Sequence, residues 1–341
     1  MSQVCMTPII SPKAWRGETL ARETSWIVTL TDAEIADIDR AVTTAKASGL
    51  PLERIQREHF PLTVTREKLE KAVTEMYDGR GFVLLRGLPV RRYSDEDVGL
   101  IFWGFGRYMG APLYQNPQGE LLGHVYDHGR TYGNIDVRGY ETNAYLPYHT
   151  DAGDVVGLLC LRRSLEGGLS SIVSSSTVHN EILARHPEYL GLLYNGYYYI
   201  RREAALTERG VSERPIPVFG YQDGVVSCRY IRNQINAGAV KREVPLTTFE
   251  RAALDFLDEQ TRRPDLRLDM DLQAGDIQFI NNYTILHSRT GFVDGPEPDQ
   301  KRHMLRLWLK FPRPWPLSGE FPTHMGYKPA QDTPDLVEAE R

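Results

Sequence analysis

Cysteine is scarce in this sequence of 341 residues, which contains only Cys5, Cys160 and Cys228. No two of them form a C-x-x-C motif, so the sequence indicates neither a disulfide framework nor a zinc site. Cys160 lies in an apolar run and is predicted to be a packed small hydrophobe. We therefore discount a cysteine nucleophile and expect reduced thiols, as in a cytoplasmic protein.

Long apolar runs and an excess of basic charge are also missing. The longest clear apolar run, Val155 to Leu161, is interrupted by Gly157 and is far too short to span a bilayer. Residues 1–19 contain no continuous apolar stretch of signal-peptide length. The formal net charge of −5 and the pI of about 6.0 give no electrostatic footprint for nucleic acid. We expect a cytoplasmic protein that binds neither membranes nor nucleic acid.

What the sequence does contain is a set of residues suited to a metal. In a β-strand, residues i and i+2 point to the same face, so His149 and Asp151 can reach one ion while Thr150 points away. A third ligand, His287, follows 138 residues later (287 − 149), shortly after the β-prone run Ile277 to Ile280. Two imidazoles and one carboxylate can hold one face of an octahedral Fe(II) and leave three positions open.

A second pattern follows the late histidine. In the apolar run 302–309, Arg302, Met304 and Arg306 share one face of a predicted strand. Buried arginines are costly unless each meets an anion, and the planar guanidinium suits a carboxylate. We interpret this strand as a carboxylate-binding wall.

These motifs resemble those of the 2-oxoglutarate-dependent Fe(II) oxygenases of the taurine dioxygenase and clavaminate synthase-like superfamily. The similarity includes His149-x-Asp151, the turn Gly167-Gly168-Leu169-Ser170, Gly275-Asp276 before a strand, His287-Ser288-Arg289-Thr290 and Arg302-x-x-x-Arg306. It covers roughly residues 80 to 312.

The resemblance implies a role for each of these residues. It assigns Fe(II) to His149, Asp151 and His287, and the distal carboxylate of the co-substrate 2-oxoglutarate to Arg302 and Ser170. Arg306 would hold either a substrate anion or the same carboxylate. With O2, such an enzyme forms succinate and CO2 and oxidises a C–H bond. Related halogenases lack the carboxylate, so Asp151 favours hydroxylation, desaturation or ring formation.

The primary substrate is predicted to be a small anion, such as an amino acid or a natural-product intermediate. Tyr114, Gln115 and Tyr145 lie in segments before or beside the metal motif, where loops often carry specificity, and are candidates for substrate contact. Arg232 is a further candidate, for which a surface ion pair is the commoner alternative. An amino-acid substrate would also need a partner for its ammonium, and we consider Asp127, Asp136 and Asp154.

The predicted fold is mainly β with flanking helices, a double-stranded β-helix or jelly roll with an insertion between the early and late ligand strands. Residues 1–80 form a helical support, 81–312 the core with its insertion, and 313–341 a tail, all in one catalytic domain. Homo-oligomerisation stays open. Expected helices span about 31–47, 65–77, a segment opened by Ser94, 178–183 and 247–262, and expected strands include 82–85, 194–200, 225–230 and 277–280.

Two other functional classes fit part of the pattern. A cupin-like metalloenzyme that does not use 2-oxoglutarate would leave Arg302 and Arg306 without a shared purpose. A non-catalytic binding scaffold would have no need for an intact set of metal ligands.

Overall fold

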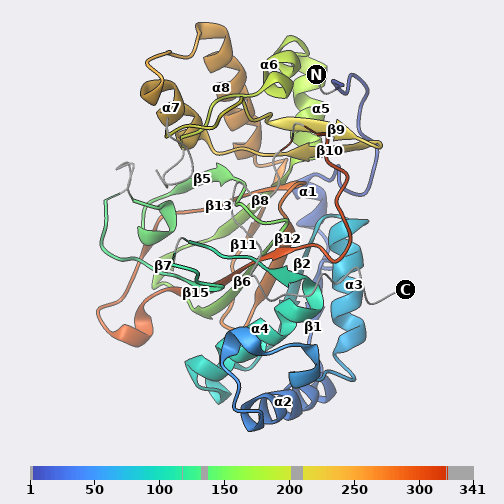
Figure 1. Cartoon of the computed structure of the whole chain (residues 1–341), viewed down its shortest axis with the longest axis vertical. Helices are drawn as coiled ribbons and strands as arrows, with labels where there is room; N and C mark the ends of the chain where they lie inside the picture. The colour runs from blue at the N-terminus through green and yellow to red at the C-terminus, as the bar shows by residue number, and fades with distance from the viewer. Residues whose placement is uncertain (1–2, 117, 132–136, 201–209, 320, 322–341) are drawn as a thin grey trace.

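The computed structural model describes residues 3–116, 118–131, 137–200, 210–319 and 321. Its centre consists of two β-sheets that pack face to face, with helices around them (Figure 1). The larger sheet has the order β1-β2-β12-β6-β15-β3, with β4 also paired to β15, and the smaller has the order β11-β8-β13-β5. The predicted double-stranded β-helix is confirmed.

The strands of the larger sheet are β1 (Ile27–Thr29), β2 (Phe82–Arg86), β3 (Ala111–Pro112), β4 (Leu122–Val125), β6 (Val155–Arg162), β12 (Ile277–Asn281) and β15 (His303–Lys310). Those of the smaller sheet are β5 (Leu146–His149), β8 (Ser170–Ser174), β11 (Arg267–Met270) and β13 (Ile285–Arg289). Two further pairs are β7 (Glu166–Gly167) with β14 (Phe292–Val293), and β9 (Phe219–Gln222) with β10 (Val225–Cys228).

The period-two alternation of the strands divides the apolar side chains between two cores. On β15, Met304 and Trp308 belong to the core cluster that lies between the sheets, while Leu305 and Leu307 belong to the cluster on the outer face. Arg302, just before β15, and Arg306 fall on the inner face with Met304. Arg302 and Arg306, the carboxylate-binding wall predicted from the sequence, therefore face the space between the sheets.

Helices from the N-terminal part cover the outer face of the larger sheet. They are α2 (Asp32–Ala47), α3 (Arg66–Tyr77) and α4 (Asp95–Met109). Thr31 and Glu34 form the predicted capping box of α2, and the Ser94 hydroxyl caps α4. Phe102, Trp103 and Phe105 are packing residues, as expected. Short helical segments are α1 (Gly17–Leu20) and the 3-10 turns Leu52–Arg54, Arg57–His59, Val90–Arg92, Gly139–Glu141 and Pro298–Gln300.

The insertion between the ligand strands β5 and β13, here defined as residues 175–262, is mainly helical. It contains α5 (Ser175–Arg185), α6 (Glu188–Asn195), α7 (Arg232–Lys241) and α8 (Thr248–Arg262), which gather with β9 and β10 at the top of Figure 1. The predicted strand 194–200 is wrong: Tyr194 lies in α6, and Tyr197 and Ile200 form only isolated bridges. The predicted strand 225–230 ends at Cys228 and belongs to the separate β9–β10 pair.

The metal motif departs from the simplest strand geometry. His149 is the last residue of β5, so Asp151 lies in the turn that follows, and His287 occupies the centre of β13. β5 and β13 pair with His149 opposite His287, which brings together residues far apart in sequence.

The three cysteines are buried and free, with the pKa of Cys160 raised to about 12 by burial. In the described part of the chain, no helix is long and apolar enough to cross a membrane.

Candidate metal and anion site

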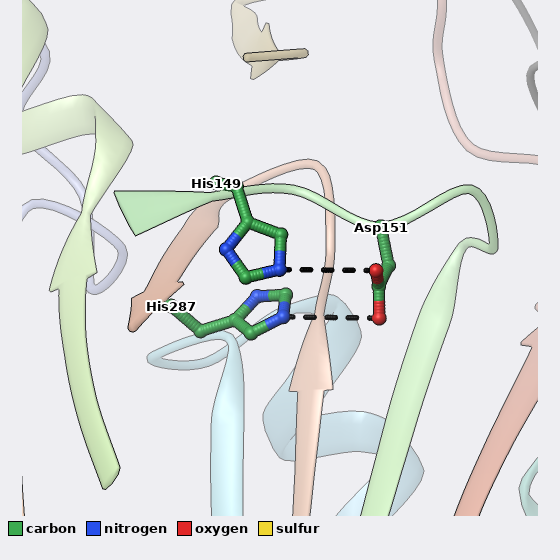
Figure 2. A group of neighbouring side chains, drawn as sticks. All are labelled: His149, Asp151 and His287. Atoms are coloured by element: carbon green, nitrogen blue, oxygen red, sulfur yellow. Dashed lines mark ion pairs between the residues drawn. The ribbon is translucent and has the colours of Figure 1, made fainter. Parts of the chain in front are cut away.

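His149, Asp151 and His287 converge on one point. Their ligand atoms all lie within 4.8 Å of one another. The distance from His149 Nε2 to Asp151 Oδ1 is 3.9 Å, and that from His287 Nε2 to Asp151 Oδ2 is 3.8 Å. Figure 2 shows both imidazoles turned toward the carboxylate. Two nitrogens and a carboxylate oxygen can thus serve a single metal ion.

The imidazole orientations leave the Nε2 atoms available. His149 Nδ1 lies 2.8 Å from the carbonyl oxygen of Pro147, so its N–H donates there and the lone pair stays on Nε2. The Nδ1 atom of His287 is buried and has no hydrogen-bond partner among the described residues. Fixing the tautomer of a histidine, as the Pro147 carbonyl does for His149, is typical of metal ligands.

Asp151 is held through both its backbone and its side chain. Its N–H donates to Asn282 Oδ1 at 2.9 Å, and its carbonyl oxygen accepts from Asn282 Nδ2 at 2.7 Å and from Arg229 Nη1. The indole N–H of Trp308 donates to Oδ2 at 2.9 Å. The carboxylate is therefore oriented by the protein's own groups.

Electrostatics favour the protonation states that a metal needs. Burial alone would raise the pKa of Asp151, but Arg306, the two imidazoles and the Trp308 N–H together lower it to about 2. Burial lowers the pKa of His149, and burial with the neighbouring His149 and Arg306 charges lowers that of His287 to about 3. At neutral pH the site has two neutral imidazoles and one carboxylate.

The triad opens into a cavity of about 220 Å³ between the sheets and the insertion. Among the described residues, Asp151 is the one acid that lines it, whereas five lining residues are arginines. These arginines are Arg138, Arg232, Arg289, Arg302 and Arg306. Arg232 is paired with Asp255 and Asp258, but the other four arginines still outnumber the one acid, and this balance of charge favours anionic ligands.

Arg302 is buried at one end of this cavity. Its guanidinium lies 5.3 Å from the centre of the Phe292 ring, and its buried Nη1 has no hydrogen-bond partner among the described residues. Burial lowers its pKa. Ser170 is also buried and lines the cavity, with its hydroxyl 3.4 Å from Gln278 Oε1. A buried guanidinium of this kind calls for an anion.

The turn at Gly167 and Gly168 packs against Arg302, and position 168 requires glycine. Gly168 has φ +70°, and a Cβ there would lie 2.8 Å from Ser164 Oγ and 3.1 Å from Arg302 Nε. Glycine therefore meets two requirements at this position, the left-handed backbone and the close approach of the arginine.

Arg306 lies nearer the metal ligands and is held rigidly. Its Nε donates to Gln115 Oε1 at 2.7 Å, and its guanidinium lies between the rings of Tyr140 at 4.6 Å and Trp308 at 4.5 Å. Its Nη1 is 3.6 Å from Asp151 Oδ2. Nη1 therefore lies near the triad, while Nε is bonded to Gln115.

The proposed substrate residues are placed less uniformly. Gln115 does not line the cavity; it is buried behind Arg306. Tyr114 packs beside the outer core and Tyr145 is 43% exposed, and neither lines the cavity. Arg232 lines the cavity but forms ion pairs with Asp255 at 2.7 Å and Asp258 at 3.0 Å, the alternative considered for it.

The acids considered for a substrate ammonium are not part of the described cavity wall. Asp154 is buried and accepts hydrogen bonds from the Tyr283 hydroxyl and the Phe311 N–H. Asp127 caps the backbone of Gly129, and Asp136 lies outside the described residues.

Sequence reasoning missed several contributors to the site. Trp308 could have been found, because it lies two residues after Arg306 and so shares its face of the strand. Asn282, Arg229 and Arg138 gave no such signal, since only the tertiary fold brings them near the triad.

Comparison with known proteins agrees with this geometry. The model of the family described as "Taurine catabolism dioxygenase TauD, TfdA family" matches residues 47–308. The FR-33289 synthase of Streptomyces rubellomurinus is 29% identical over 316 residues, which cover 91% of this chain and 92% of that protein. The taurine hydroxylase-like protein SAT17 of Stachybotrys chartarum is 29% identical over 86% of this chain and 77% of its own length.

Solved structures show the same fold at lower sequence identity. Asparagine oxygenase, in complex with Fe(II), hydroxyasparagine and succinate, superposes with a TM-score of 0.65 at 17% identity, covering 83% of this chain and 93% of that one. The non-heme iron oxygenase OrfP with Fe and alpha-ketoglutaric acid gives a TM-score of 0.61 at 17% identity, covering 83% and 94%.

Proposed function

Since the chain belongs to the TauD/TfdA family of dioxygenases, we propose that it is an Fe(II)- and 2-oxoglutarate-dependent oxygenase with His149, Asp151 and His287 as the metal ligands. The observation that carries this proposal is the convergence of three ligand atoms within 4.8 Å at the wall of a cavity that also contains Arg302. The whole chain would act as one catalytic domain, and its buried free thiols support a cytoplasmic location.

The side chains of the site fit both Fe(II) and 2-oxoglutarate. Two neutral imidazoles and a carboxylate are the donor set of non-heme Fe(II) oxygenases, and they leave coordination positions for a 2-oxo acid. The buried, unpartnered Nη1 of Arg302 supports a role in holding the distal carboxylate of 2-oxoglutarate. The Ser170 hydroxyl, which lines the same cavity, would help to hold this carboxylate. When bound, the iron would couple decarboxylation of 2-oxoglutarate to succinate with oxidation of a substrate C–H bond by O2.

The chain itself would supply orientation and exclusion of water. Trp308 and Asn282 hold Asp151, and the Pro147 carbonyl fixes His149, so the ligands are arranged before the metal arrives. The apolar side chains of Leu146, Leu158 and Met304 on the cavity wall would keep bulk water from the reacting groups.

The substrate would be a small anion. The Nε atom of Arg306 donates to Gln115 and its Nη1 atom lies near the triad, which supports binding of either a substrate anion or a carboxylate of 2-oxoglutarate. A relative that is 28% identical over half of this chain is named uridine-5'-phosphate dioxygenase. Solved structures of asparagine oxygenase and OrfP contain a hydroxyasparagine and a hydroxyarginine, respectively. Amino acids, natural-product intermediates and phosphorylated compounds therefore head the substrate screen.

The deciding experiment is an anaerobic titration of the iron-loaded protein with 2-oxoglutarate, followed by admission of air. A visible metal-to-ligand charge-transfer band and then succinate are expected in the wild type, and the band should be lost in Arg302→Ala. Arg163→Ala is the matched control, because Arg163 pairs with Asp271 on the surface at 2.7 Å. Bound iron without a band would favour a metalloenzyme that does not use 2-oxoglutarate, and absence of iron binding would favour the scaffold.

A further inference from the structure

The middle residue of the metal motif, Thr150, is hydrogen-bonded to Tyr230, which follows β10 in the insertion. Thr150 is fully buried, and its N–H donates to the Tyr230 carbonyl oxygen at 2.9 Å. In return, the Tyr230 N–H donates to the Thr150 hydroxyl oxygen at 3.1 Å. These two reciprocal bonds tie the turn that carries Asp151 to the segment between β10 and α7.

Arg229, the neighbour of Tyr230, reaches the metal ligand itself. It is fully buried, its Nη1 donates to the carbonyl oxygen of Asp151, and its guanidinium lies 5.2 Å from the centre of the Tyr283 ring. Its Nε and Nη2 have no hydrogen-bond partner among the described residues. Burying an arginine with few hydrogen-bond partners costs free energy, and the bond to the Asp151 carbonyl is one polar contact that offsets this cost.

The same segment continues into the cavity wall. Residues 231–234, which begin α7, line the cavity together with the arginines of the carboxylate wall. The segment is also anchored from behind, because the Tyr230 hydroxyl donates to Asp258 on α8 at 2.6 Å and Arg232 pairs with the same carboxylate. Residues 229–234 therefore contact Asp151 at one end and line the cavity at the other.

We propose that residues 229–234 couple the substrate wall of the cavity to the metal site, with Arg229 and Tyr230 as positioning residues for Asp151. The inference rests on the proposed function, since it takes Asp151 to be a metal ligand. When Asp151 holds a metal, the hydrogen bond from Arg229 to the Asp151 carbonyl is stabilised, and this bond orders the start of α7. By linkage, a substrate that orders residues 231–234 tightens metal binding by the same factor by which the metal tightens substrate binding.

The test is hydrogen exchange of the backbone amides, measured by mass spectrometry with and without Fe(II) and 2-oxoglutarate under anaerobic conditions. In the wild type, loading should slow exchange in α7, although no α7 residue is a metal ligand. Arg229→Leu should weaken Fe(II) binding by about tenfold to a hundredfold, the usual effect of losing a partner of a ligand. It should also abolish the loading-dependent protection of α7.

The matched control is Arg242→Leu, at the other end of the same helix. Arg242 is exposed and stacks on Tyr198 at 3.6 Å, so this variant should keep both the Fe(II) affinity and the protection. If Arg229→Leu does not fold, Thr150→Val removes the acceptor of the Tyr230 N–H while Arg229 stays in place, and it should lose part of the protection.

Two results would overturn the coupling. One is a wild type that forms the charge-transfer band but shows unchanged exchange in α7. The other is a folded Arg229→Leu protein with wild-type Fe(II) affinity and protection. Failure of the proposed function has a different signature, since the wild type would then form no charge-transfer band at all.

Discussion

At the scale of single residues, the site depends on side chains that do not touch the metal. Trp308→Phe keeps most of the packing volume but removes the N–H that donates to Asp151 Oδ2 at 2.9 Å. We expect Fe(II) affinity to fall by about tenfold to a hundredfold, because partners of metal ligands typically contribute that much. Isothermal titration under anaerobic conditions measures the effect.

A matched tryptophan separates this effect from general destabilisation. Trp103→Phe also loses an indole hydrogen bond, the one to the Ile55 carbonyl at 3.0 Å, but it lies in the outer core. It should lower stability by about 1 kcal/mol and leave Fe(II) binding unchanged. Equal Fe(II) affinity in the two variants would show that Trp308 does not orient the carboxylate.

Gly168 offers a second residue-scale prediction. Alanine there would have to adopt φ +70° and would place its Cβ 2.8 Å from Ser164 Oγ and 3.1 Å from Arg302 Nε. Gly129 has the same φ of +70°, but a Cβ added there would meet no atom within 4 Å, so Gly129→Ala isolates the backbone strain of about 1 to 2 kcal/mol. Both variants should lose stability, but only Gly168→Ala should raise the Kd for 2-oxoglutarate. A normal Kd in Gly168→Ala would mean that Arg302 tolerates displacement.

The sequence predicts the residue motifs and one of their supports, Trp308, but not the other supports. The short, even spacing marked Arg302, Met304 and Arg306 as side chains on one face of a strand. For His149 and Asp151 the spacing found the pair, but Asp151 lies in the turn after β5 and not on the strand itself. Arg229 and Asn282 come from a loop and a turn whose positions only the assembled sheets define.

At the scale of elements, a buried acid joins two helices of the N-terminal part. The Asp37 carboxylate on α2 accepts hydrogen bonds from the N–H groups of Thr63, Val64 and Thr65 just before α3. Burial would raise its pKa, but the bonds from Thr65, Thr63 and Val64 lower it from 3.8 to about 2. Since the folded-state pKa is depressed, the contribution to stability, about 2 kcal/mol, is present above pH 4 and is lost as the pH falls toward 2.

Denaturant unfolding of wild type and Asp37→Asn at several pH values tests this. The difference in unfolding free energy should be largest at neutral pH and shrink as the pH approaches the folded-state pKa. Asp39→Asn on the same helix is the control, because Asp39 is a half-exposed partner of Arg92 and should show little difference. A pH-independent difference for Asp37 would point to packing instead of charge.

Elements differ in how well the sequence predicts them. The helices opened by Thr31, Ser94 and Thr247 were predicted because a capping side chain marks the first turn locally. The stretch 194–200 was misjudged because its tyrosines have high strand propensity, yet Tyr194 packs as the end of α6 and Tyr199 as part of a buried loop. Tertiary packing of aromatic side chains outweighed local propensity there.

At the scale of the whole molecule, the metal would join parts of the chain that fold from distant sequence. The order of the larger sheet places β12 between β2 and β6, and β13 lies against β5, so each sheet mixes early and late strands. Such crossovers leave no trace in a local pattern, which is why the fold followed from the resemblance and not from strand periodicity.

This topology makes a prediction about global stability. Because His149 and Asp151 precede the insertion and His287 follows it, a metal that binds only the folded chain must stabilise all of it, by about 2.7 kcal/mol at a free concentration of 100 times the Kd. Anaerobic thermal melts should therefore show a higher Tm with Fe(II), a further rise with 2-oxoglutarate, and reversal by a chelator. Asp151→Ala should remove the response, whereas Asp269→Ala, exposed on β11 of the same sheet, should keep it. A Tm that rises equally in both variants would place the metal elsewhere and leave His149, Asp151 and His287 as a polar cluster without a ligand.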